Sequence, residues 1–395
     1  MYYNRKSSQV KQIAILVLLI LIWAVLYFLP LGDDQAVGDN VASATDNQDE
    51  SQMEQSGDPL DLQAGELLSQ MSVEQKVAQM FIITPEDLTG VARVTVAGGT
   101  TQAALSEFQV GGLVYGSSNI VSPEQISTMI ANTQTYAREA GGLSLFACID
   151  EQGGGASQLA GNENFGTVET ADLSSLTSRD EAYEVGNEIG AYLNSYGFNV
   201  DFAPLGNLLY DLSDIQSFGS NPDTVGFLAD GMAQGLIANG VLATMKYFPA
   251  LEGTAASEKT LEQLQSSDLV PFASAIEQNI PLIMVGHVTM PQIATDNVPS
   301  SLSKAVVTDL LKGDLDYQGL VVSDALNKET ITAVYSSDQA AIKAIQAGND
   351  MLLMPEEFTS AYQGVLAAID SGEISIEQID QSVTKIIKAK LQLES

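Results

Sequence analysis

From about residue 60 to the C-terminus, short apolar runs alternate with stretches whose apolar residues recur at helical spacing. The runs are typical of strands that are buried on both faces, as in a parallel sheet. We predict eight strands, at residues 77–83, 112–115, 143–149, 199–203, 242–248, 282–286, 320–323 and 351–354. Helix-start signals accompany them, since Ser72 and Gln75 form a capping box and Pro123 follows the N-cap residue Ser122. This pattern predicts an α/β fold, a closed (β/α)₈ TIM barrel, rather than an open doubly wound sheet.

Residues 13–30 differ from this pattern because they form an almost unbroken apolar run. The run reaches the roughly 17–25 residues that a helix needs to span a bilayer, and it exceeds the ~7–15 apolar residues of an ordinary signal peptide. Basic residues precede it and aspartates follow it, which is typical of a single-pass anchor with a cytoplasmic N-terminus. We predict a transmembrane signal anchor, and the alternative is a cleaved signal peptide and a secreted protein.

The segment between this run and the first helix is strongly polar. It is rich in Asp, Gln, Ser and Gly, a composition that stays solvated and disordered. The predicted organisation is a cytoplasmic tail at residues 1–12, the membrane anchor at 13–30, an acidic linker at 31–60 and an extracellular barrel at 61–395.

Charge and composition exclude several classes of function. The 395 residues include 50 acidic and 16 basic side chains, so the formal net charge is −34 and nucleic acid is not an expected partner. The single cysteine, Cys148, lies in an apolar run and is expected to be buried and inert. One histidine cannot form a His-Glu-x-x-His zinc site, and the sequence has neither a calcium-binding loop nor a Gly-x-Gly-x-x-Gly motif after the first strand. We therefore predict no metal and no cofactor.

Polar residues stand at the C-terminal ends of four predicted strands. Asp150 follows the third strand, Lys246 ends the fifth, His287 follows the sixth and Asp324 follows the seventh. In a barrel these ends share one mouth, where catalytic groups are found. Each residue alone could be an ordinary loop residue, but burying four polar groups at apolar strand ends is costly without a purpose. We therefore expect the four side chains to converge on a functional site.

Seven short motifs run through the whole predicted barrel. They are residues 68–80, 111–114 (Gly-Gly-Leu-Val), 149–154 (Ile-Asp-Glu-Gln-Gly-Gly), 216–219 (Gln-Ser-Phe-Gly), 246–249 (Lys-Tyr-Phe-Pro), 286–288 (Gly-His-Val) and 319–326 (Gly-Leu-Val-Val-Ser-Asp-Ala-Leu). In content and order these motifs resemble those of family 3 glycoside hydrolases of the single-barrel type, whose best-known members are β-N-acetylhexosaminidases.

The resemblance implies roles for the strand-end residues. Asp324 corresponds to the family's nucleophile, which a retaining glycosidase uses to form a glycosyl-enzyme. Asp150 and Lys246 correspond to residues that hold the sugar, and His287 to a histidine beside it. The implied partner is a β-glycoside, typically of N-acetylhexosamine. With an outward-facing anchor, a cell-wall glycan such as a peptidoglycan fragment is expected.

The sequence departs from the family at its acid/base loop and at its sugar-binding residues. The family's Asp-x-His dyad, which acts as general acid and base, corresponds to Ser257 and Lys259, and neither side chain can take its counterpart's role. Positions at which the family has arginine or histidine hold Gly155, Gln158, Gln216 and Tyr247. We retain Gln216 and Tyr247 as candidate sugar-binding residues, although an amide replaces a bidentate guanidinium only in part.

Three interpretations of the sequence remain open. The first is an active retaining glycosidase with a relocated acid, for which Glu252 and Glu258 in the same loop are candidates, because a glutamate with a raised pKa can protonate a glycosidic oxygen. The second is a catalytically impaired domain that binds glycan without turnover. The third is a surface scaffold that binds no sugar.

Overall fold

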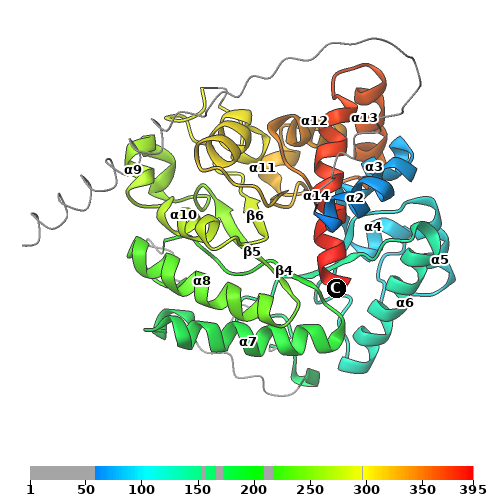
Figure 1. The fold of residues 1–395 in the computed structure, drawn as a ribbon, viewed down its shortest axis with the longest axis horizontal. Coiled ribbons are helices and arrows are strands. Elements are labelled where there is room, and N and C mark those ends of the chain that lie inside the picture. Colours follow the sequence, from blue (N-terminus) through cyan, green and yellow to red (C-terminus); the bar gives the residue numbers. More distant parts are fainter. Residues whose placement is uncertain are drawn as a thin grey trace, which may run out of the picture. The chain divides into compact units, whose positions relative to one another are not determined.

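The computed structural model describes residues 58–153, 157–159, 161–165, 172–208, 217–295 and 297–394. In this part of the chain, eight parallel strands form a ring that helices surround (Figure 1). The ring closes because β1 pairs with both β2 and β8, and β7 is bridged to β8 through Val322 and Met351. The predicted barrel is thus confirmed. Its strands are β1 (Phe81–Ile83), β2 (Gly112–Val114), β3 (Phe146–Ile149), β4 (Val200–Asp201), β5 (Leu242–Phe248), β6 (Leu282–Val285), β7 (Leu320–Ser323) and β8 (Leu352–Leu353).

Helices that precede β1, connect successive strands and follow β8 lie around the ring (Figure 1). Their bounds are α2 (Pro59–Gln70), α3 (Val73–Gln79), α4 (Pro85–Thr89), α5 (Gly99–Glu107), α6 (Pro123–Gly141), α7 (Arg179–Tyr196), α8 (Pro222–Ala238), α9 (Leu261–Gln265), α10 (Val270–Glu277), the π-helix η6 (Ala305–Asp314), α11 (Glu329–Thr332), α12 (Ser337–Ala347), α13 (Phe358–Asp370) and α14 (Ile376–Glu394). Two short 3₁₀ helices near the site are η4 (Ala255–Glu258) and η5 (Ser300–Leu302).

The first strand begins later than the sequence pattern predicted. Residues 77–79 were expected to be the start of a strand, but they are the last turn of α3. The predicted capping box is present: the Ser72 hydroxyl oxygen accepts from the Gln75 N–H at 3.3 Å, and Gln75 Oε1 accepts from the Ser72 N–H at 2.8 Å. Because this cap starts a helix that continues to Gln79, the apolar residues before Phe81 belong to the helix.

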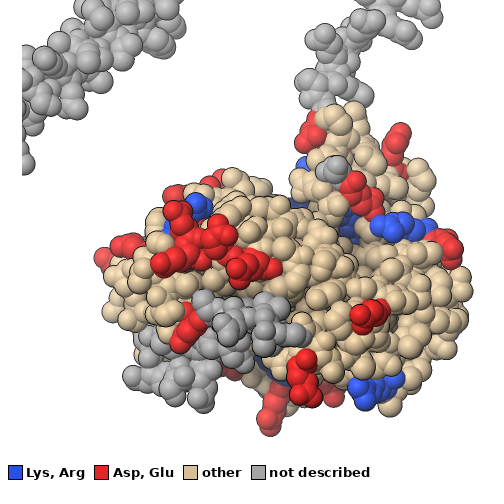
Figure 2. Space-filling view, turned by 90° about the horizontal axis from the view of Figure 1, so that it is seen from below, with Lys and Arg blue, Asp and Glu red and all other residues tan. Residues whose placement is uncertain are grey.

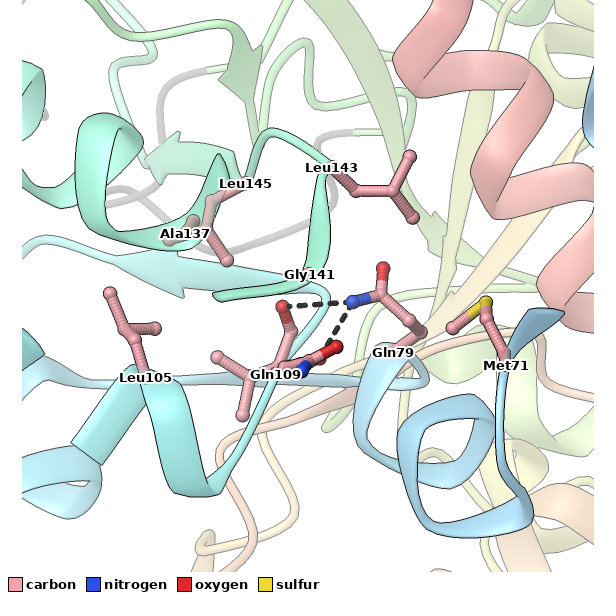
Figure 3. Close-up of a pocket in the computed structure, with 9 residues that line it drawn as sticks. Met71, Gln79, Leu105, Gln109, Ala137, Gly141, Leu143 and Leu145 are labelled. Atoms are coloured by element: carbon pink, nitrogen blue, oxygen red, sulfur yellow. Dashed lines mark hydrogen bonds between the residues drawn. The ribbon is translucent and has the colours of Figure 1, made fainter. Parts of the chain in front are cut away.

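The N-terminal end of the barrel is closed by packed side chains. Gln79 Nε2 donates to the carbonyl oxygens of Gln109 at 2.6 Å and Val110 at 3.4 Å, which ties α3 to the segment before β2 (Figure 3). Gln79 Oε1 in turn accepts from the ammonium of Lys390 at 2.7 Å. Cys148, in β3, is buried as predicted.

The predicted N-terminal anchor concerns residues that the structure does not describe. The segments at 1–12 and 13–30 and nearly all of the linker lie outside the described residues. Within the described part of the chain, no helix has the length and apolar character needed to cross a membrane. The anchor and the cellular location therefore stay predictions.

Candidate active site

Strands β3 and β5 bring Asp150 and Lys246 together at the mouth of the barrel. The Lys246 ammonium lies 2.7 Å from Asp150 Oδ2, and Lys246 is only 2% exposed, whereas the Asp150 side chain faces solvent in part. Burial opposes a charge on Lys246, but the charge and hydrogen bond of Asp150, together with the nearby acidic groups of Tyr247 and Asp201, outweigh it and raise the pKa of the lysine. The result is a charged, preformed pair whose carboxylate can accept hydrogen bonds from a ligand.

Asp324 follows directly after β7 and is 6% exposed. Its two carboxylate oxygens have different partners. Oδ1 accepts from the backbone N–H of Ala325 at 2.8 Å, and Oδ2 accepts from the ammonium of Lys328 at 2.6 Å. The carboxylate is thereby fixed in one orientation at the barrel mouth, as a group that reacts with a bound ligand would need to be.

His287, which follows β6, positions the backbone next to Asp324. Its Nε2 lies 2.9 Å from the Ala325 carbonyl oxygen, which can only accept, so Nε2 carries the proton. Nδ1 then accepts from the Ser301 hydroxyl at 2.8 Å. Burial lowers the pKa of His287 and thus favours the neutral ring. Since Nε2 is 4.0 Å from Asp324 Oδ2 and already donates elsewhere, His287 acts on the aspartate through Ala325.

Tyr247 connects the two ion pairs of the mouth. Its ring centroid lies 5.3 Å from the ammonium of Lys246 and 5.2 Å from that of Lys328. The backbone of Tyr247 is held by Asn207, whose side chain donates to its carbonyl oxygen at 2.9 Å and accepts from its N–H at 2.7 Å. The aromatic face therefore forms one wall of the site between Asp324 and Lys246.

Two buried acids support the turn that carries Asp150. Glu151 accepts from the N–H groups of Gln158 at 2.6 Å and Leu159 at 3.0 Å, and from the Tyr192 hydroxyl at 2.7 Å. Asp201, at the end of β4, accepts from the N–H of Glu151 at 2.8 Å. Its second oxygen has no hydrogen-bond partner within the described chain, and burial raises the pKa of Asp201 well above its usual range. Sequence reasoning missed Asp201, although it too ends a strand.

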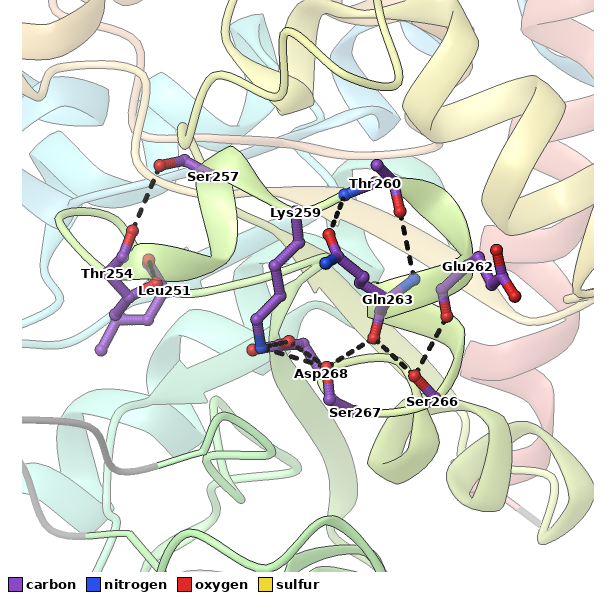
Figure 4. Close-up of polar contacts among 10 residues, drawn as sticks. All are labelled: Leu251, Thr254, Ser257, Lys259, Thr260, Glu262, Gln263, Ser266, Ser267 and Asp268. Carbon is purple, nitrogen blue, oxygen red and sulfur yellow. Dashed lines mark hydrogen bonds and ion pairs between the residues drawn. The ribbon is translucent and has the colours of Figure 1, made fainter.

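In the loop after β5, Ser257 and Lys259 make polar contacts with groups of the loop itself and of the segment that follows it (Figure 4). The Ser257 hydroxyl donates to the Thr254 carbonyl oxygen at 3.2 Å. The Lys259 ammonium lies 2.5 Å from Asp268 Oδ2 and 3.1 Å from the Ser267 hydroxyl, in the connection between α9 and α10. The Ser257 contact lies within the loop, and the Lys259 contacts tie the loop to the connection between α9 and α10.

Of the two candidate glutamates, Glu252 is associated with the site. Its Oε1 accepts from the hydroxyl of Thr330, in α11 just beyond Asp324, at 2.8 Å. Its negative charge is also among those that act to raise the pKa values of His287 and Lys328. Glu258 is exposed at the end of η4 and makes none of the contacts described above.

The remaining sequence-predicted positions are less informative. Gln216 and Gly155 lie outside the described residues, so their placement is open. Gln158 contributes its backbone N–H to Glu151. Among the described residues, no group of three His, Cys, Asp or Glu side chains could hold a metal ion.

A closed (β/α)₈ barrel with carboxylates and a lysine at its mouth has the architecture of barrel glycosidases. The sequence matches the family described as "Glycosyl hydrolase family 3 N terminal domain" over residues 72–389. Because this match covers most of the chain, the chain belongs to glycoside hydrolase family 3.

Individual relatives agree with this assignment. β-Hexosaminidase A of Pseudoalteromonas piscicida is 28% identical over 327 residues, which are 73% of this chain and 54% of that protein. β-Hexosaminidase LpqI of Mycobacterium tuberculosis is 27% identical over 340 residues, 81% of this chain and 83% of the relative. The solved structure of a family 3 β-N-acetylglucosaminidase from Paenibacillus sp. superposes with a TM-score of 0.75 at 29% identity, covering 82% of this chain and 64% of that chain. The chain thus spans only part of two of these three relatives.

Proposed function

We propose that the barrel hydrolyses a β-linked N-acetylhexosaminide with retention of configuration, through a glycosyl-enzyme on Asp324. The observation that carries the proposal is the position of Asp324, which lies at the end of β7 beside Tyr247 and is held by Ala325 and Lys328. The choice of sugar rests on the relatives, which are named β-hexosaminidases and a β-N-acetylglucosaminidase.

Each side chain of the mouth has a chemical task in this proposal. Asp324 attacks the anomeric carbon, and the Asp150–Lys246 pair accepts from and donates to sugar hydroxyls. Tyr247 offers a flat apolar face on which a sugar ring can pack. Glu252 donates a proton to the departing oxygen and then accepts one from the water that releases the sugar.

A second candidate function is binding of the same sugar without turnover. The observation that favours it is the loop after β5, where Ser257 and Lys259, the residues that the sequence resemblance aligns with the family's dyad, are engaged by Thr254 and Asp268. In this case the Asp150–Lys246 pair and Tyr247 would still hold the sugar. A scaffold that binds no sugar is the third outcome that the experiments below separate.

Substitution of the nucleophile tests the first candidate. Asp324→Asn removes the attacking charge while preserving shape, so hydrolysis of 4-nitrophenyl N-acetyl-β-glucosaminide should fall by about 10³-fold or more. Asp309→Asn, which changes an exposed aspartate paired with Lys304, is the matched control and should retain full activity. Activity that survives in a folded Asp324→Asn protein would exclude Asp324 as the nucleophile. Saturable sugar binding without hydrolysis in the wild type would establish the second candidate, and no binding the third.

The identity of the acid is tested by a matched pair of glutamate variants. Glu252→Gln should lower kcat by about 10²–10⁴-fold on di-N-acetylchitobiose, whose leaving oxygen needs a proton. The loss should be smaller on the 4-nitrophenyl substrate, because 4-nitrophenolate leaves without protonation. Glu258→Gln, the same change at another exposed glutamate of this loop, should leave both rates unchanged. The opposite pattern would make Glu258 the acid, and equal rates in all three proteins would exclude both.

We also propose a location for this activity. The apolar run at residues 13–30 would anchor the protein with the barrel outside the cell, where a cell-wall glycan such as a peptidoglycan fragment is within reach. In intact cells, an external protease should remove the barrel from the membrane fraction. Recovery of the protein in the medium would instead support a cleaved signal peptide.

A further inference from the structure

Lys328 contacts the proposed nucleophile more closely than any other side chain described around it. Its ammonium lies 2.6 Å from Asp324 Oδ2 and 5.2 Å from the Tyr247 ring centroid. The Lys328 side chain is 43% exposed, whereas that of Asp324 is 8% exposed, so the lysine covers the aspartate from the solvent side. No role was assigned to Lys328 from the sequence, although it stands only four positions after Asp324.

The backbone holds Lys328 in this position independently of the ion pair. The Lys328 N–H donates to the Ala325 carbonyl oxygen at 3.2 Å, which is the same oxygen that His287 Nε2 contacts at 2.9 Å. The Lys328 carbonyl oxygen accepts from the N–H groups of Ile331 at 2.9 Å and Thr332 at 3.0 Å, at the start of α11. The contact with Asp324 is therefore part of an ordered turn, since its backbone is fixed on both sides.

This contact affects the two steps of a retaining reaction in opposite directions. In the first step, an Asp324 oxygen lone pair forms a bond to the anomeric carbon while the bond to the leaving oxygen breaks, and that oxygen departs with the electron pair. Asp324 loses its negative charge as it becomes an ester, so a charge-assisted hydrogen bond from Lys328 stabilises the starting state more than the transition state.

The second step restores the charge on the aspartate. A water oxygen bonds to the anomeric carbon, the bond from that carbon to the Asp324 oxygen breaks, and the electron pair returns to the carboxylate. The water gives its proton to the general base, which is Glu252 in the proposed mechanism. The Lys328 ammonium faces the carboxylate as its charge returns and therefore favours this release.

We propose that Lys328 is a positioning residue that restrains Asp324, slowing its attack on the sugar and hastening release of the glycosyl-enzyme. The inference rests on the proposed reaction at Asp324. Lys328 thus determines which of the two steps limits the rate.

Burst kinetics test the inference. With 4-nitrophenyl N-acetyl-β-glucosaminide, Lys328→Met should release the first equivalent of 4-nitrophenolate at least about tenfold faster than the wild type. Later turnovers should be slower than this burst, and a glycosyl-enzyme should accumulate and be visible by mass spectrometry. Lys328→Arg preserves the charge and should behave as the wild type. Lys304→Met, which removes an exposed lysine paired with Asp309, is the control for loss of a surface charge.

A second variant covers the case in which Lys328→Met does not fold. Removal of the ammonium leaves the buried Asp324 carboxylate without its ion-pair partner. An unpaired buried charge lowers the free energy of unfolding. Lys328→Gln still offers a neutral donor to Oδ2, so it should fold and show a smaller acceleration. A rise in the first-step rate is a result that a purely structural role of Lys328 would not produce.

The outcomes separate this inference from the proposed function. If the wild type is active and Lys328→Met or Lys328→Gln has a faster first step, the result supports both the proposed hydrolysis and the restraint of Asp324 by Lys328. An inactive wild type with active Lys328 variants supports the restraint but overturns hydrolysis as the function of the native chain. An active wild type whose variants are equal or slower overturns the restraint alone. If the wild type and the folded variants all fail to release 4-nitrophenolate, the result overturns both the proposed hydrolysis and the restraint by Lys328.

Discussion

Lys390 is a fully buried charged side chain of α14. It is 1% exposed, its ammonium donates to Gln79 Oε1 at 2.7 Å, and it lies 5.2 Å from the centroid of the Phe146 ring. Burial lowers the pKa of Lys390 to about 7. The folded protein thus holds this proton far less tightly than the unfolded chain, in which a lysine titrates near pH ~10.4.

The stability of the protein should accordingly rise with pH above neutrality. Between pH about 7 and about 10, the unfolded chain carries a proton on Lys390 that the folded chain has released. The free energy of unfolding then increases by up to about 1.4 kcal/mol per pH unit from this residue, and below that window the contribution is constant. Urea unfolding at successive pH values should show this slope in the wild type and a flatter curve in Lys390→Met.

A lysine on the same helix provides the control for this prediction. Lys388 in α14 is partly exposed and pairs with Asp61 at 2.6 Å. Lys388→Met should leave the pH slope of unfolding as it is in the wild type. If Lys390→Met retains the wild-type slope as well, the buried ammonium is not the source of the pH dependence.

Single residues of the site differ in how far the sequence predicted them. Asp150, Lys246, His287 and Asp324 could be expected at one mouth, because parallel strands in a barrel end on the same side. The contact of Lys328 with Asp324 could not, because it depends on the conformation of a turn outside any periodic element.

The elements themselves follow from periodicity to different degrees. The predicted strands at 242–248 and 320–323 match β5 and β7 at both ends, whereas the predicted runs at 143–149 and 199–203 are longer than β3 and β4. An apolar run in the sequence indicates which residues are buried. The strand itself includes only the residues whose backbone pairs with a neighbouring strand, so it can be shorter than the run. A helical turn can be equally apolar, which is why the prediction at 77–79 was wrong.

Helices α7 and α8 lie side by side on the outside of the barrel, and glycines permit their close approach (Figure 1). A Cβ atom on Gly235 of α8 would lie 2.2 Å from the Tyr183 carbonyl oxygen and 2.5 Å from the Asn187 nitrogen. A Cβ atom on Gly186 of α7 would lie 2.0 Å from the Met232 carbonyl oxygen. Backbone contact from both sides leaves no room for a side chain at this crossing.

Gly235→Ala should therefore destabilise the barrel although alanine is the better helix former. We expect a loss of about 1–3 kcal/mol in the free energy of unfolding, because overpacking outweighs the gain of up to ~1 kcal/mol in helix propensity. Gly65→Ala in α2 is the matched control, since a Cβ atom there meets nothing within 4 Å. It should be neutral or stabilising in the same urea titration. A stabilised Gly235→Ala protein would show that the helices can separate without cost.

At the scale of the whole molecule, the dominant property is negative charge. The chain has 50 acidic and 16 basic side chains, and the face in Figure 2 shows several separate groups of acidic side chains, with fewer basic ones, on a largely uncharged described surface. Like charges at this density repel one another and oppose the compact state, while they favour solubility. Salt screens this repulsion, because the Debye length falls from about 10 Å at 0.1 M to about 3 Å at 1 M.

Thermal stability should therefore increase with ionic strength. Between about 10 mM and 500 mM NaCl we expect the Tm to rise by a few degrees, since a change of about 1 kcal/mol shifts a domain of this size by about 2–4 °C. Potassium chloride should act in the same way if screening is the cause. A Tm that is unchanged or falls with salt would mean that ion pairs such as Lys246–Asp150 outweigh the general repulsion.

The bridge between Val322 and Met351 joins the last strand of the ring to the seventh, and Asp324 follows only two residues later. Each of the eight strands consequently has a neighbour on both sides, so a second copy of the chain finds no free edge to extend. A chain shortened before β8 would expose unpaired backbone on β1 and on β7 at once, and the opening would run beside Asp324. Premature termination near the C-terminus would thus yield an open, aggregation-prone sheet instead of a slightly smaller barrel.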